Sequence, residues 1–403
     1  MCIKNMSNYI ENDSQISVCV LAPEMPPVIG GAETFSEVLV LSLIKKRIRV
    51  YLITSKRPRD FVVTKIEQNG GKVFLTEDVF QCKDGFVAWE WAFFSRAQLL
   101  HDVITTYRID LVHALSHDTI ISASIALCNT KKHIPLVITT SEMSTEDSEF
   151  GIARSKFTYN VQIDGLLQLS QYYLDIAYKY GCKPILAKVT SCVDCDMFLN
   201  GDGAEARKKY NISDDKFIIV CPSRFSPRKG QKDLIEAISK LPENLKNKIV
   251  CFLAGSTNSA SKLYYDGIVE LSKKVNFEVI IQSVKREEMP NLITAADLCV
   301  MPSKKEGLGF AAIECLVAGC PVLLSNTSGF NEISDSGDQV ELFELGDNNL
   351  LSNKIENLIV DDMRRRTLAE NGKKLALTKF SMNNFADQVF LFYHDLLDYQ
   401  RNY

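Results

Sequence analysis

The 403-residue sequence predicts an α/β protein of two Rossmann-like domains with a cleft between them. The first observation is a repeated alternation of short apolar segments and segments of helical periodicity, which is typical of parallel sheets with helical crossovers. The second is a polar stretch, residues 200–209, that separates two such series. The third is a glycine-rich loop between a strand and a helix in the second series, a place where parallel sheets bind ligands.

The first series predicts a domain that covers residues 1–198. It opens with an apolar strand at 16–22, then Gly30 and Gly31, then a helix around 35–44. Paired glycines let the backbone approach a ligand closely, although they also suit a plain tight turn. The elements that follow are strands at 49–54, 110–114, 136–140 and 166–169 and helices at 95–107, from 119, and at 172–180.

The second series predicts a domain that covers residues 199–380. Its expected strands are 217–221, 249–254, 278–281, 298–301, 322–324 and 340–343, and its expected helices are 232–241, 262–273, 287–294 and 311–318. A last helix at 382–399 carries five aromatic residues, so it must cover its apolar side on another surface. It forms a third segment, residues 381–403.

The loop before the helix at 311–318 predicts an anion site. A helix that starts near Gly309 or Phe310 leaves its first N–H groups unpaired, and its dipole favours an anion such as diphosphate. Glu306 and Glu314 flank this position. Carboxylates repel phosphate, so we expect them to accept hydrogen bonds from hydroxyl groups on either side of it, as a nucleotide sugar would supply. The alternative is that either residue only caps the helix or faces solvent.

A second loop supplies positive charge. Arg224 and Lys229 follow the strand at 217–221 and precede a helix, and both can reach one diphosphate. At about 4 Å and an effective dielectric constant near 20, each cation–phosphate pair contributes roughly 4 kcal/mol before desolvation. The alternative is a solvated basic turn.

Together these motifs, with Gly319, Pro321 and Gly329 after them, resemble the donor-site signature of the retaining glycosyltransferases of family GT4, which have the GT-B fold. The resemblance implies a hexosyltransferase-type enzyme (EC 2.4) of polysaccharide synthesis and a C-terminal helix that crosses back to the first domain. It implies catalytic roles for Glu306, Arg224 and Lys229. The donor-binding residues that it implies are Gly30, Gly31, Arg224, Lys229, Val284, Glu306, Gly307, Leu308, Gly309, Phe310 and Glu314.

The resemblance also implies a UDP-, GDP- or ADP-linked sugar as co-substrate, with no cofactor and no metal required. The acceptor would be a carbohydrate, a lipid-linked saccharide or a small molecule. Glu314 would hold the ribose, and Glu306 would orient the donor sugar. The acceptor hydroxyl would attack the donor sugar from the same face as that from which the leaving group departs. A phosphate oxygen would act as the base.

Several positions depart from the family pattern. Ser141, next to Glu142, stands where the family often has a histidine that faces the transferred sugar, and Gln282 stands where a glycine is usual before Val284. These departures keep two alternatives open. One is a non-catalytic GT-B subunit that binds a nucleotide sugar or a glycosylated partner, and the other is a nucleotide-sugar epimerase.

The histidines and the cysteine and aspartate pairs of the first half of the chain are isolated, so a structural role is the simplest interpretation of each. His113 and His117 lie at the end of a strand and just after it, so they join Ser141 and Glu142 as acceptor-side candidates, although an isolated histidine is more often structural. The pairs Cys192/Cys195 and Asp194/Asp196 lack further ligands nearby, so we expect no metal site.

Composition and charge limit the partners. A net charge of −4 gives no general attraction to nucleic acid. The polar first 15 residues lack the apolar run of a signal peptide, and no apolar window is long enough to span a membrane, so we expect a cytoplasmic protein. The cations of residues 45–49 could contact the inner face of a membrane, but they equally suit a helix C-terminus.

Overall fold

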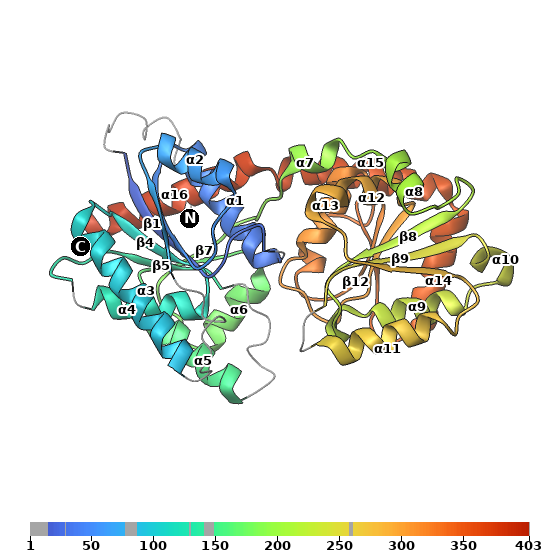
Figure 1. Cartoon of the computed structure of the whole chain (residues 1–403), viewed down its shortest axis with the longest axis horizontal. Helices are drawn as coiled ribbons and strands as arrows, with labels where there is room; N and C mark the ends of the chain where they lie inside the picture. The colour runs from blue at the N-terminus through green and yellow to red at the C-terminus, as the bar shows by residue number, and fades with distance from the viewer. Residues whose placement is uncertain are drawn as a thin grey trace. The chain divides into compact units, whose positions relative to one another are not determined.

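The computed structural model describes residues 15–28, 30–76, 87–128, 130–140, 149–257 and 261–402. The chain divides into two compact units, each with its own sheet (Figure 1). The first unit contains residues 1–168, 177–187 and 386–403, and the second contains residues 169–176 and 188–385.

The sheet of the first unit has the strand order β3-β2-β1-β4-β5-β6-β7. Each pairing from β3 to β6 runs parallel. The interior strand β1 is buried along its whole length, as expected for a parallel strand covered on both faces. The strands are β1 (Ser17–Ala22), β2 (Arg49–Thr54), β3 (Lys72–Leu75), β4 (Leu111–Ala114), β5 (Leu136–Ile138), β6 (Gly165–Gln168) and β7 (Ile185–Lys188).

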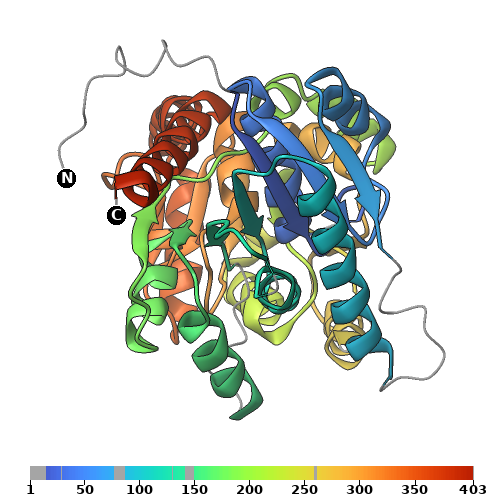
Figure 2. The same cartoon turned by 90° about the vertical axis from the view of Figure 1, so that its left-hand side faces the viewer.

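The helices of the first unit cover both faces of this sheet (Figure 2). They are α1 (Gly31–Lys45), α2 (Asp60–Gln68), α3 (Val87–Thr106), α4 (His117–Leu127), α5 (Glu149–Asn160) and the C-terminal α16 (Met382–Asn402). The helix α6 (Gln171–Lys179) contributes residues to both units.

The C-terminal helix packs on the first unit, which confirms the expected return of the chain (Figure 2). The hydroxyl of Tyr393 on α16 lies 2.6 Å from Nδ1 of His113 on β4, and both side chains are buried. A Cβ on Gly165 would lie 3.0 Å from the ring of Phe392, so the small residue admits the helix. Lys46, at the end of α1, forms an ion pair with Asp387. The aromatic side of α16 is therefore covered by the first sheet.

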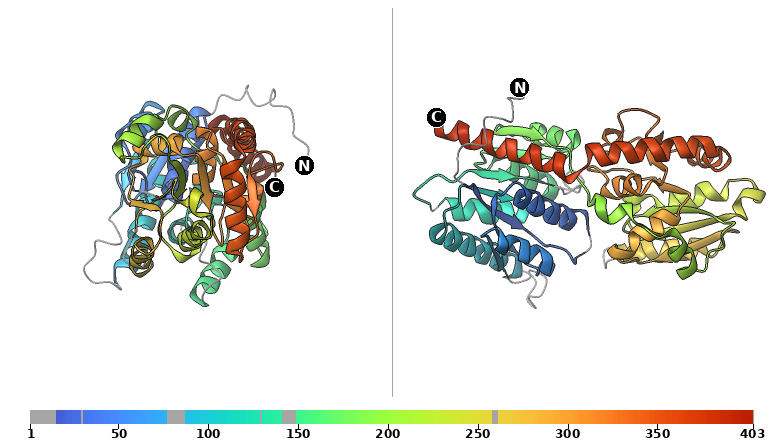
Figure 3. Two further views of the ribbon diagram at one scale, coloured as in Figure 1. Left: turned by 90° about the vertical axis from the view of Figure 1, so that its right-hand side faces the viewer. Right: turned by 90° about the horizontal axis from the view of Figure 1, so that it is seen from above.

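The sheet of the second unit has the order β10-β9-β8-β11-β12-β13, and its pairings are parallel. Helices lie against both faces of this sheet (Figure 3). Two parallel Rossmann-like sheets confirm the predicted fold class. The strands are β8 (Phe217–Pro222), β9 (Ile249–Ala254), β10 (Glu278–Gln282), β11 (Leu298–Met301), β12 (Val322–Ser325) and β13 (Glu341–Phe343).

Alternate residues of these strands belong to two apolar cores, one on each face of the second sheet. On β8, Ile218 and Val220 join the core under α12 and α13, whereas Ile219 and Cys221 join the core under α9 and α14. This follows from the period-two alternation of side chains along a strand. The helices are α7 (Cys195–Leu199), α8 (Gly203–Lys209), α9 (Gln231–Ser239), α10 (Glu243–Lys246), α11 (Lys262–Ser272), α12 (Met289–Ala295), α13 (Phe310–Ala318), α14 (Asn348–Val360) and α15 (Asp362–Lys379).

The polar stretch that we expected to be a linker is helical in part. Asp202 accepts a hydrogen bond from the backbone N–H of Glu205 (3.0 Å) and so caps α8. An N-cap aspartate followed by a short charged helix gives little apolar periodicity, so the pattern did not reveal it. Among the described residues, no helix has the length and apolar character needed to cross a membrane.

Candidate functional site

The helix α13 presents an uncapped N-terminus at the carboxyl end of β11. Gly309 precedes it with φ 94°, and Gly319 ends it with φ 79°, both in the left-handed region that favours glycine. The first N–H groups bonded within the helix are those of Ala312 and Ile313, which donate to the carbonyl of Gly309. No described side chain caps this end. The preceding N–H groups, those of Phe310 and Ala311, are therefore directed out of the helix, as an anion site requires.

Glycines in the loop before α13 are required by close packing. A Cβ on Gly309 would lie 2.3 Å from the ring of Phe330, and one on Gly307 would lie 2.1 Å from the hydroxyl of Tyr173. Gly329, with φ 77°, packs in turn against the backbone of Gly307. The loop is thus held in one shape by its neighbours. Leu308, between the two loop glycines, is buried in the core and anchors it.

Glu306 lies in this loop, and two cations hold it. Its carboxylate is 6% exposed, accepts a hydrogen bond from Nζ of Lys229, and lies 3.6 Å from the guanidinium of Arg228. Burial acts to raise the pKa of Glu306, but the charges of Lys229 and Arg228 outweigh it and lower that pKa below its usual value. Glu306 is therefore an ionised hydrogen-bond acceptor at neutral pH.

The cationic loop packs directly against the acidic one. Lys229 ends the 3₁₀ turn Pro227–Lys229, and Gly230 follows with φ 71°. A Cβ on Gly230 would lie 2.2 Å from the carbonyl oxygen of Pro302, so only glycine allows the two loops to approach this closely. The backbone N–H of Lys304 donates to the carbonyl of Arg228 (2.8 Å) and fixes their register.

Arg224 has a fixed backbone and an exposed side chain. Nε2 of Gln231 donates to the carbonyl of Arg224 (3.0 Å) and to the hydroxyl of Ser223 (3.0 Å). Among the described residues, no carboxylate lies within ion-pair distance of its guanidinium. Arg224 thus presents a positive charge from a rigid support, available to an anionic ligand.

Glu314 lies one turn into α13 and is 6% exposed. Its Oε1 accepts a hydrogen bond of 2.8 Å from Arg286, which belongs to the 3₁₀ turn Arg286–Glu288 after β10. Burial raises the pKa of Glu314, because the charge of Arg286 only partly offsets desolvation and Asp194 adds repulsion. The two glutamates of the motif therefore have opposite pKa shifts.

Val284 is buried in the core on the α13 face of the sheet. Its side chain is thus structural, and only its backbone could meet a ligand. The side-chain amide of Gln282, in the place of the usual glycine, donates to the carbonyl of Ser283 (3.2 Å). The backbone contact expected of this segment stays a prediction.

Strand order brings these residues together. Arg224 and Lys229 follow β8, and Glu306 follows β11, which is hydrogen-bonded to β8. β8 leads to β9 on one side and pairs with β11 on the other, so the order of strands reverses between β8 and β11. Ligands of open parallel sheets bind at the carboxyl ends of the strands beside such a reversal. The second unit therefore places two cations, two acids and one helix N-terminus at its expected ligand site.

Gly30 and Gly31 lie before and at the start of α1 in the first unit. Gly30 is extended (φ 172°), a conformation open to any residue, but a Cβ there would meet the carboxylate of Glu33 at 2.0 Å. No described side chain caps α1. Their part in donor binding stays a prediction.

The histidine candidates are buried and bonded within the first unit. Nε2 of His113 lies 2.8 Å from the hydroxyl of Thr139, its Nδ1 binds Tyr393, and the side chain is 0% exposed. Nδ1 of His117 lies 2.6 Å from the hydroxyl of Thr158. Burial lowers the pKa of each histidine to about 3, so both are neutral near pH 7. These contacts agree with the structural alternative. Ser141 and Glu142 lie outside the described residues.

The remaining motifs have local roles. Asp194 accepts a hydrogen bond from the backbone N–H of Met197 (3.1 Å) and caps α7. Within the part of the chain that the structure describes, neither Cys192 nor Cys195 forms a disulfide bond. The described residues contain no group of three or more histidine, cysteine, aspartate or glutamate side chains that could hold a metal ion.

Sequence reasoning missed Arg228 and Arg286. Each of these arginines contacts a glutamate of the motif and lies on a loop that follows a strand of the second sheet. That position after a strand is the feature of the sequence that could have indicated them. Spacing along the chain could not show that Arg286 reaches Glu314, because 28 positions separate the two residues.

Comparison with known proteins gives a family match for most of the second unit. Residues 202–375 match the family model described as glycosyl transferases group 1. This segment, which lies within the second unit, is similar to that family. The matched segment contains each cation and acid of the site.

Curated relatives of this chain align with it over part of their length. An N-acetyl-alpha-D-glucosaminyl L-malate synthase of Bacillus anthracis is 23% identical over 215 residues, which are 53% of this chain and 55% of that protein. A lipopolysaccharide 1,2-N-acetylglucosaminetransferase of Salmonella typhimurium is 28% identical over 189 residues, 45% of this chain and 49% of that protein. The chain thus spans about half the length of these relatives.

Solved structures confirm the GT-B fold over nearly all of the chain. HepE of Anabaena, in complex with UDP and glucose, superposes with a TM-score of 0.77 at 20% identity and covers 94% of this chain and 100% of its own. A sucrose-phosphate synthase of Thermosynechococcus elongatus gives a TM-score of 0.77 at 18% identity, over 95% and 100% of the two chains.

Proposed function

We propose that this protein transfers a sugar from a nucleoside-diphosphate sugar to an acceptor hydroxyl with retention of anomeric configuration. The observation that carries the proposal is the convergence of Arg224, Lys229 and the uncapped start of α13 beside β8 and β11. Each of these groups stabilises negative charge, and the leaving diphosphate gains negative charge as its bond to the sugar breaks. At about 4 Å and an effective dielectric constant near 20, each cation contributes roughly 4 kcal/mol before desolvation.

The two acids then bind the sugars on either side of the diphosphate. Glu306, ionised and oriented by Lys229, accepts hydrogen bonds from hydroxyls of the donor sugar. Glu314, farther along α13, accepts hydrogen bonds from the ribose. Lys229 contacts both Glu306 and the diphosphate in this arrangement, so it couples sugar orientation to departure of the leaving group.

The reaction exchanges one bond for another at the anomeric carbon. The bond from this carbon to the diphosphate oxygen breaks, and the acceptor oxygen forms a new bond on the same face. The proton of the acceptor hydroxyl passes to a phosphate oxygen of the departing nucleoside diphosphate. In this scheme no protein nucleophile and no metal ion is needed, since Arg224, Lys229 and the helix N-terminus supply the charge stabilisation.

The base, the donor sugar and the acceptor belong to the same proposal. UDP-, GDP- and ADP-sugars all carry the diphosphate and ribose that the site accommodates. Two relatives support a carbohydrate or lipid-linked acceptor. One is named as a lipopolysaccharide 1,2-N-acetylglucosaminetransferase and the other as a phosphatidylinositol monomannoside mannosyltransferase. A cytoplasmic location and contact of residues 45–49 with a membrane stay predictions. One of these cations, Lys46, already pairs with Asp387.

The test is the release of nucleoside diphosphate from a panel of UDP-, GDP- and ADP-sugars, with and without mixed glycan and lipid-linked acceptors. We expect release from one nucleotide class, and loss of release in Glu306→Ala with an unchanged melting temperature. Binding of a donor without release, restored by a partner protein, would instead support the non-catalytic subunit. Interconversion of two donor sugars would support the epimerase. Lys209→Met, on helix α8, removes an ion pair with Glu288 and is the matched control.

A further inference from the structure

The pair Arg286–Glu314 is unusual in its surroundings. Glu314 is the only charged residue of α13, and its neighbours Ile313 and Cys315 are fully buried. The side chains of Glu314 and Arg286 are 8% and 18% exposed, and a single hydrogen bond of 2.8 Å joins Oε1 to the guanidinium. A charged pair has therefore been placed at a position where the helix otherwise carries apolar residues.

Stability does not explain this placement. Removing two charges from water costs several kcal/mol each, and a buried pair is often no better than apolar residues of the same volume. One bond recovers only part of that cost, which agrees with the raised pKa of Glu314. The pair lies at the carboxyl end of β10, on the ligand side of the sheet.

The hydrogen bond from Arg286 engages one oxygen of the Glu314 carboxylate. Among the described residues, Arg286 is the hydrogen-bond partner of Glu314, and it uses Oε1. The side chain of Glu314 as a whole retains 8% exposure. The guanidinium of Arg286 also lies 5.5 Å from the ring centre of Phe198, a cation–π contact that limits its movement. Arg286, itself placed against Phe198, thus fixes the position of the Glu314 carboxylate.

We propose that Arg286 is a positioning residue that makes the nucleotide site select ribose over 2′-deoxyribose. By binding Oε1 of Glu314 it keeps the carboxylate ionised and turns Oε2 toward the ribose hydroxyls. A hydroxyl that donates to an ionised acceptor forms a stronger hydrogen bond than one that donates to a neutral group. The inference rests on the proposed donor site and names what sets its sugar selectivity.

The opposite role for Arg286 would be a gate. If its bond to Glu314 had to break before a nucleotide could enter, the arginine would compete with the ribose for the same carboxylate. The two roles predict opposite changes in the affinity for ribonucleotides when Arg286 is replaced. Removal of a positioning residue weakens ribonucleotide binding, whereas removal of a competitor strengthens it.

The experiment measures binding of paired ligands by calorimetry on the full chain. The pairs are UDP and 2′-deoxy-UDP, with the matching guanosine and adenosine pairs. We expect the wild-type protein to prefer the ribonucleotide by about 10-fold. In Arg286→Met the preference should fall below about 3-fold, with the affinity for the deoxynucleotide nearly unchanged. Arg286→Lys should restore part of the preference, because a lysine supplies the charge without the planar fork.

Two further variants make the result decisive. Glu314→Gln keeps the shape of the side chain and should lose the preference as Arg286→Met does, so the proposal stays testable if the methionine variant fails to fold. Lys209→Met removes a different ion pair of the same 3₁₀ turn, the one with Glu288 at 2.7 Å, and should keep the full preference.

Other results overturn the inference. An unchanged ribose preference in Arg286→Met, or tighter ribonucleotide binding in that variant, would contradict the positioning role. If the wild-type protein binds a ribonucleoside diphosphate without preference over its deoxy form, the inference fails and the donor site stands. If it binds none of the three ribonucleoside diphosphates, the donor site itself fails.

Discussion

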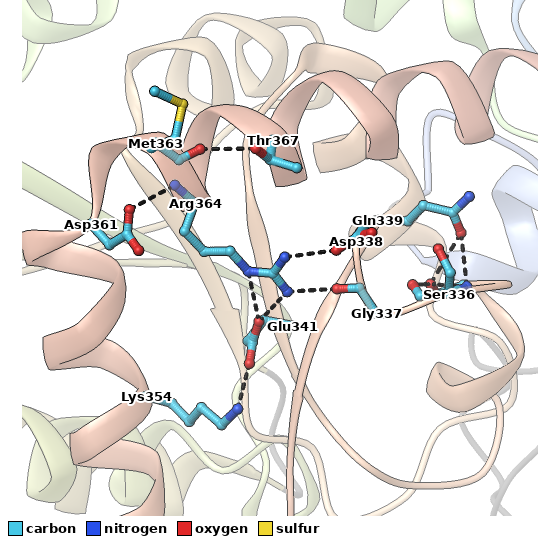
Figure 4. A network of polar contacts seen from close by, with 11 residues as sticks. Ser336, Gly337, Asp338, Gln339, Glu341, Lys354, Asp361, Met363, Arg364 and Thr367 are labelled. Atoms are coloured by element: carbon cyan, nitrogen blue, oxygen red, sulfur yellow. Dashed lines mark hydrogen bonds and ion pairs between the residues drawn. The ribbon is translucent and has the colours of Figure 1, made fainter.

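Two arginine–glutamate pairs in the second unit differ in how completely the carboxylate is bonded. Glu341, at the start of β13, uses both oxygens. Oε1 accepts from Lys354, and Oε2 accepts from Nη2 (2.7 Å) and Nε (3.3 Å) of Arg364 (Figure 4). Arg364 also binds Asp338 (3.0 Å) and the carbonyl of Gly337 (2.7 Å). Glu314, by comparison, accepts a hydrogen bond of 2.8 Å from Arg286 at Oε1.

The difference separates a structural pair from a binding pair. Glu341 joins α14, α15 and β13, and its partners lower its pKa although burial acts in the opposite direction. Glu314 is more deeply buried, and its pKa is raised. A fully bonded carboxylate has no capacity for a ligand, whereas an ionised carboxylate with fewer bonds gains its remaining bonds when a ligand arrives.

The largest expected effect is on catalysis at Glu306, a third carboxylate that is held by cations. Glu306→Ala should lower kcat/KM for sugar transfer by more than about 100-fold, because Lys229 loses its partner and the sugar loses an ionised acceptor. Steady-state kinetics check this, with circular dichroism to show an intact fold. Activity within about 3-fold of the wild type would remove Glu306 from the site.

The next effect concerns stability at the structural pair. Arg364→Met breaks bonds to Glu341, Asp338 and Gly337, so the free energy of unfolding should fall by about 1–2 kcal/mol, a value that allows for partial exposure. The affinity for nucleoside diphosphate should stay unchanged, since this network lies outside the ligand site. Urea denaturation and calorimetry measure the two quantities. If Arg364→Met lost affinity for nucleoside diphosphate while its free energy of unfolding stayed unchanged, the Arg364–Glu341 pair would serve binding and the account would be contradicted.

Acidification should affect the two glutamates in opposite ways. The raised pKa of Glu314, set by burial and by Asp194 against the charge of Arg286, means that its ionisation costs stability above the usual glutamate pKa of about 4.3. That cost disappears as the pH falls through the raised value, and the ribose preference should disappear with it. Glu341 stabilises the fold above about pH 4.3, and this contribution is lost only as the pH falls through its lowered pKa.

Calorimetric titrations at steps from neutral to mildly acidic pH check the first half of this prediction. The ribose preference should decline at a pH where the stability difference between wild type and Glu341→Gln is still constant. A preference that persists down to the unfolding transition would show that the carboxylate of Glu314 is not the acceptor.

The smallest effect is expected at Arg228. Its guanidinium lies 3.6 Å from Glu306, beyond hydrogen-bond distance, whereas Lys229 bonds to the same carboxylate directly. Arg228→Met should therefore reduce kcat/KM by only about 3–10-fold, against a much larger loss in Lys229→Met. Parallel kinetics of the two variants measure this. Equal losses would show that the two cations act as one unit.

Sequence patterns revealed the fold better than they revealed the partners of the site. Buried parallel strands such as β9 have continuous apolar segments with sharp ends, and their bounds were predicted directly. The edge strand β3 and the polar helix α15 lack such a pattern and were missed. The motif acids and Lys229 could be predicted because glycines and charges are close together in the sequence.

The partners of the site depend on tertiary contacts. Arg286 reaches Glu314 because β10 and β11 both end at the ligand side of one sheet, and no local spacing encodes that distance. His113 was an acceptor candidate because it ends a strand. The same strand position let it bond Tyr393 of the C-terminal helix, a residue 280 positions away.

The most direct test of the donor site is a crystal structure of the protein with a nucleoside diphosphate. The account predicts diphosphate oxygens on the N–H groups at the start of α13 and on Arg224 and Lys229, with a ribose hydroxyl bonded to Oε2 of Glu314 while Arg286 keeps Oε1. A nucleotide bound elsewhere, or one whose ribose does not contact Glu314, would contradict it.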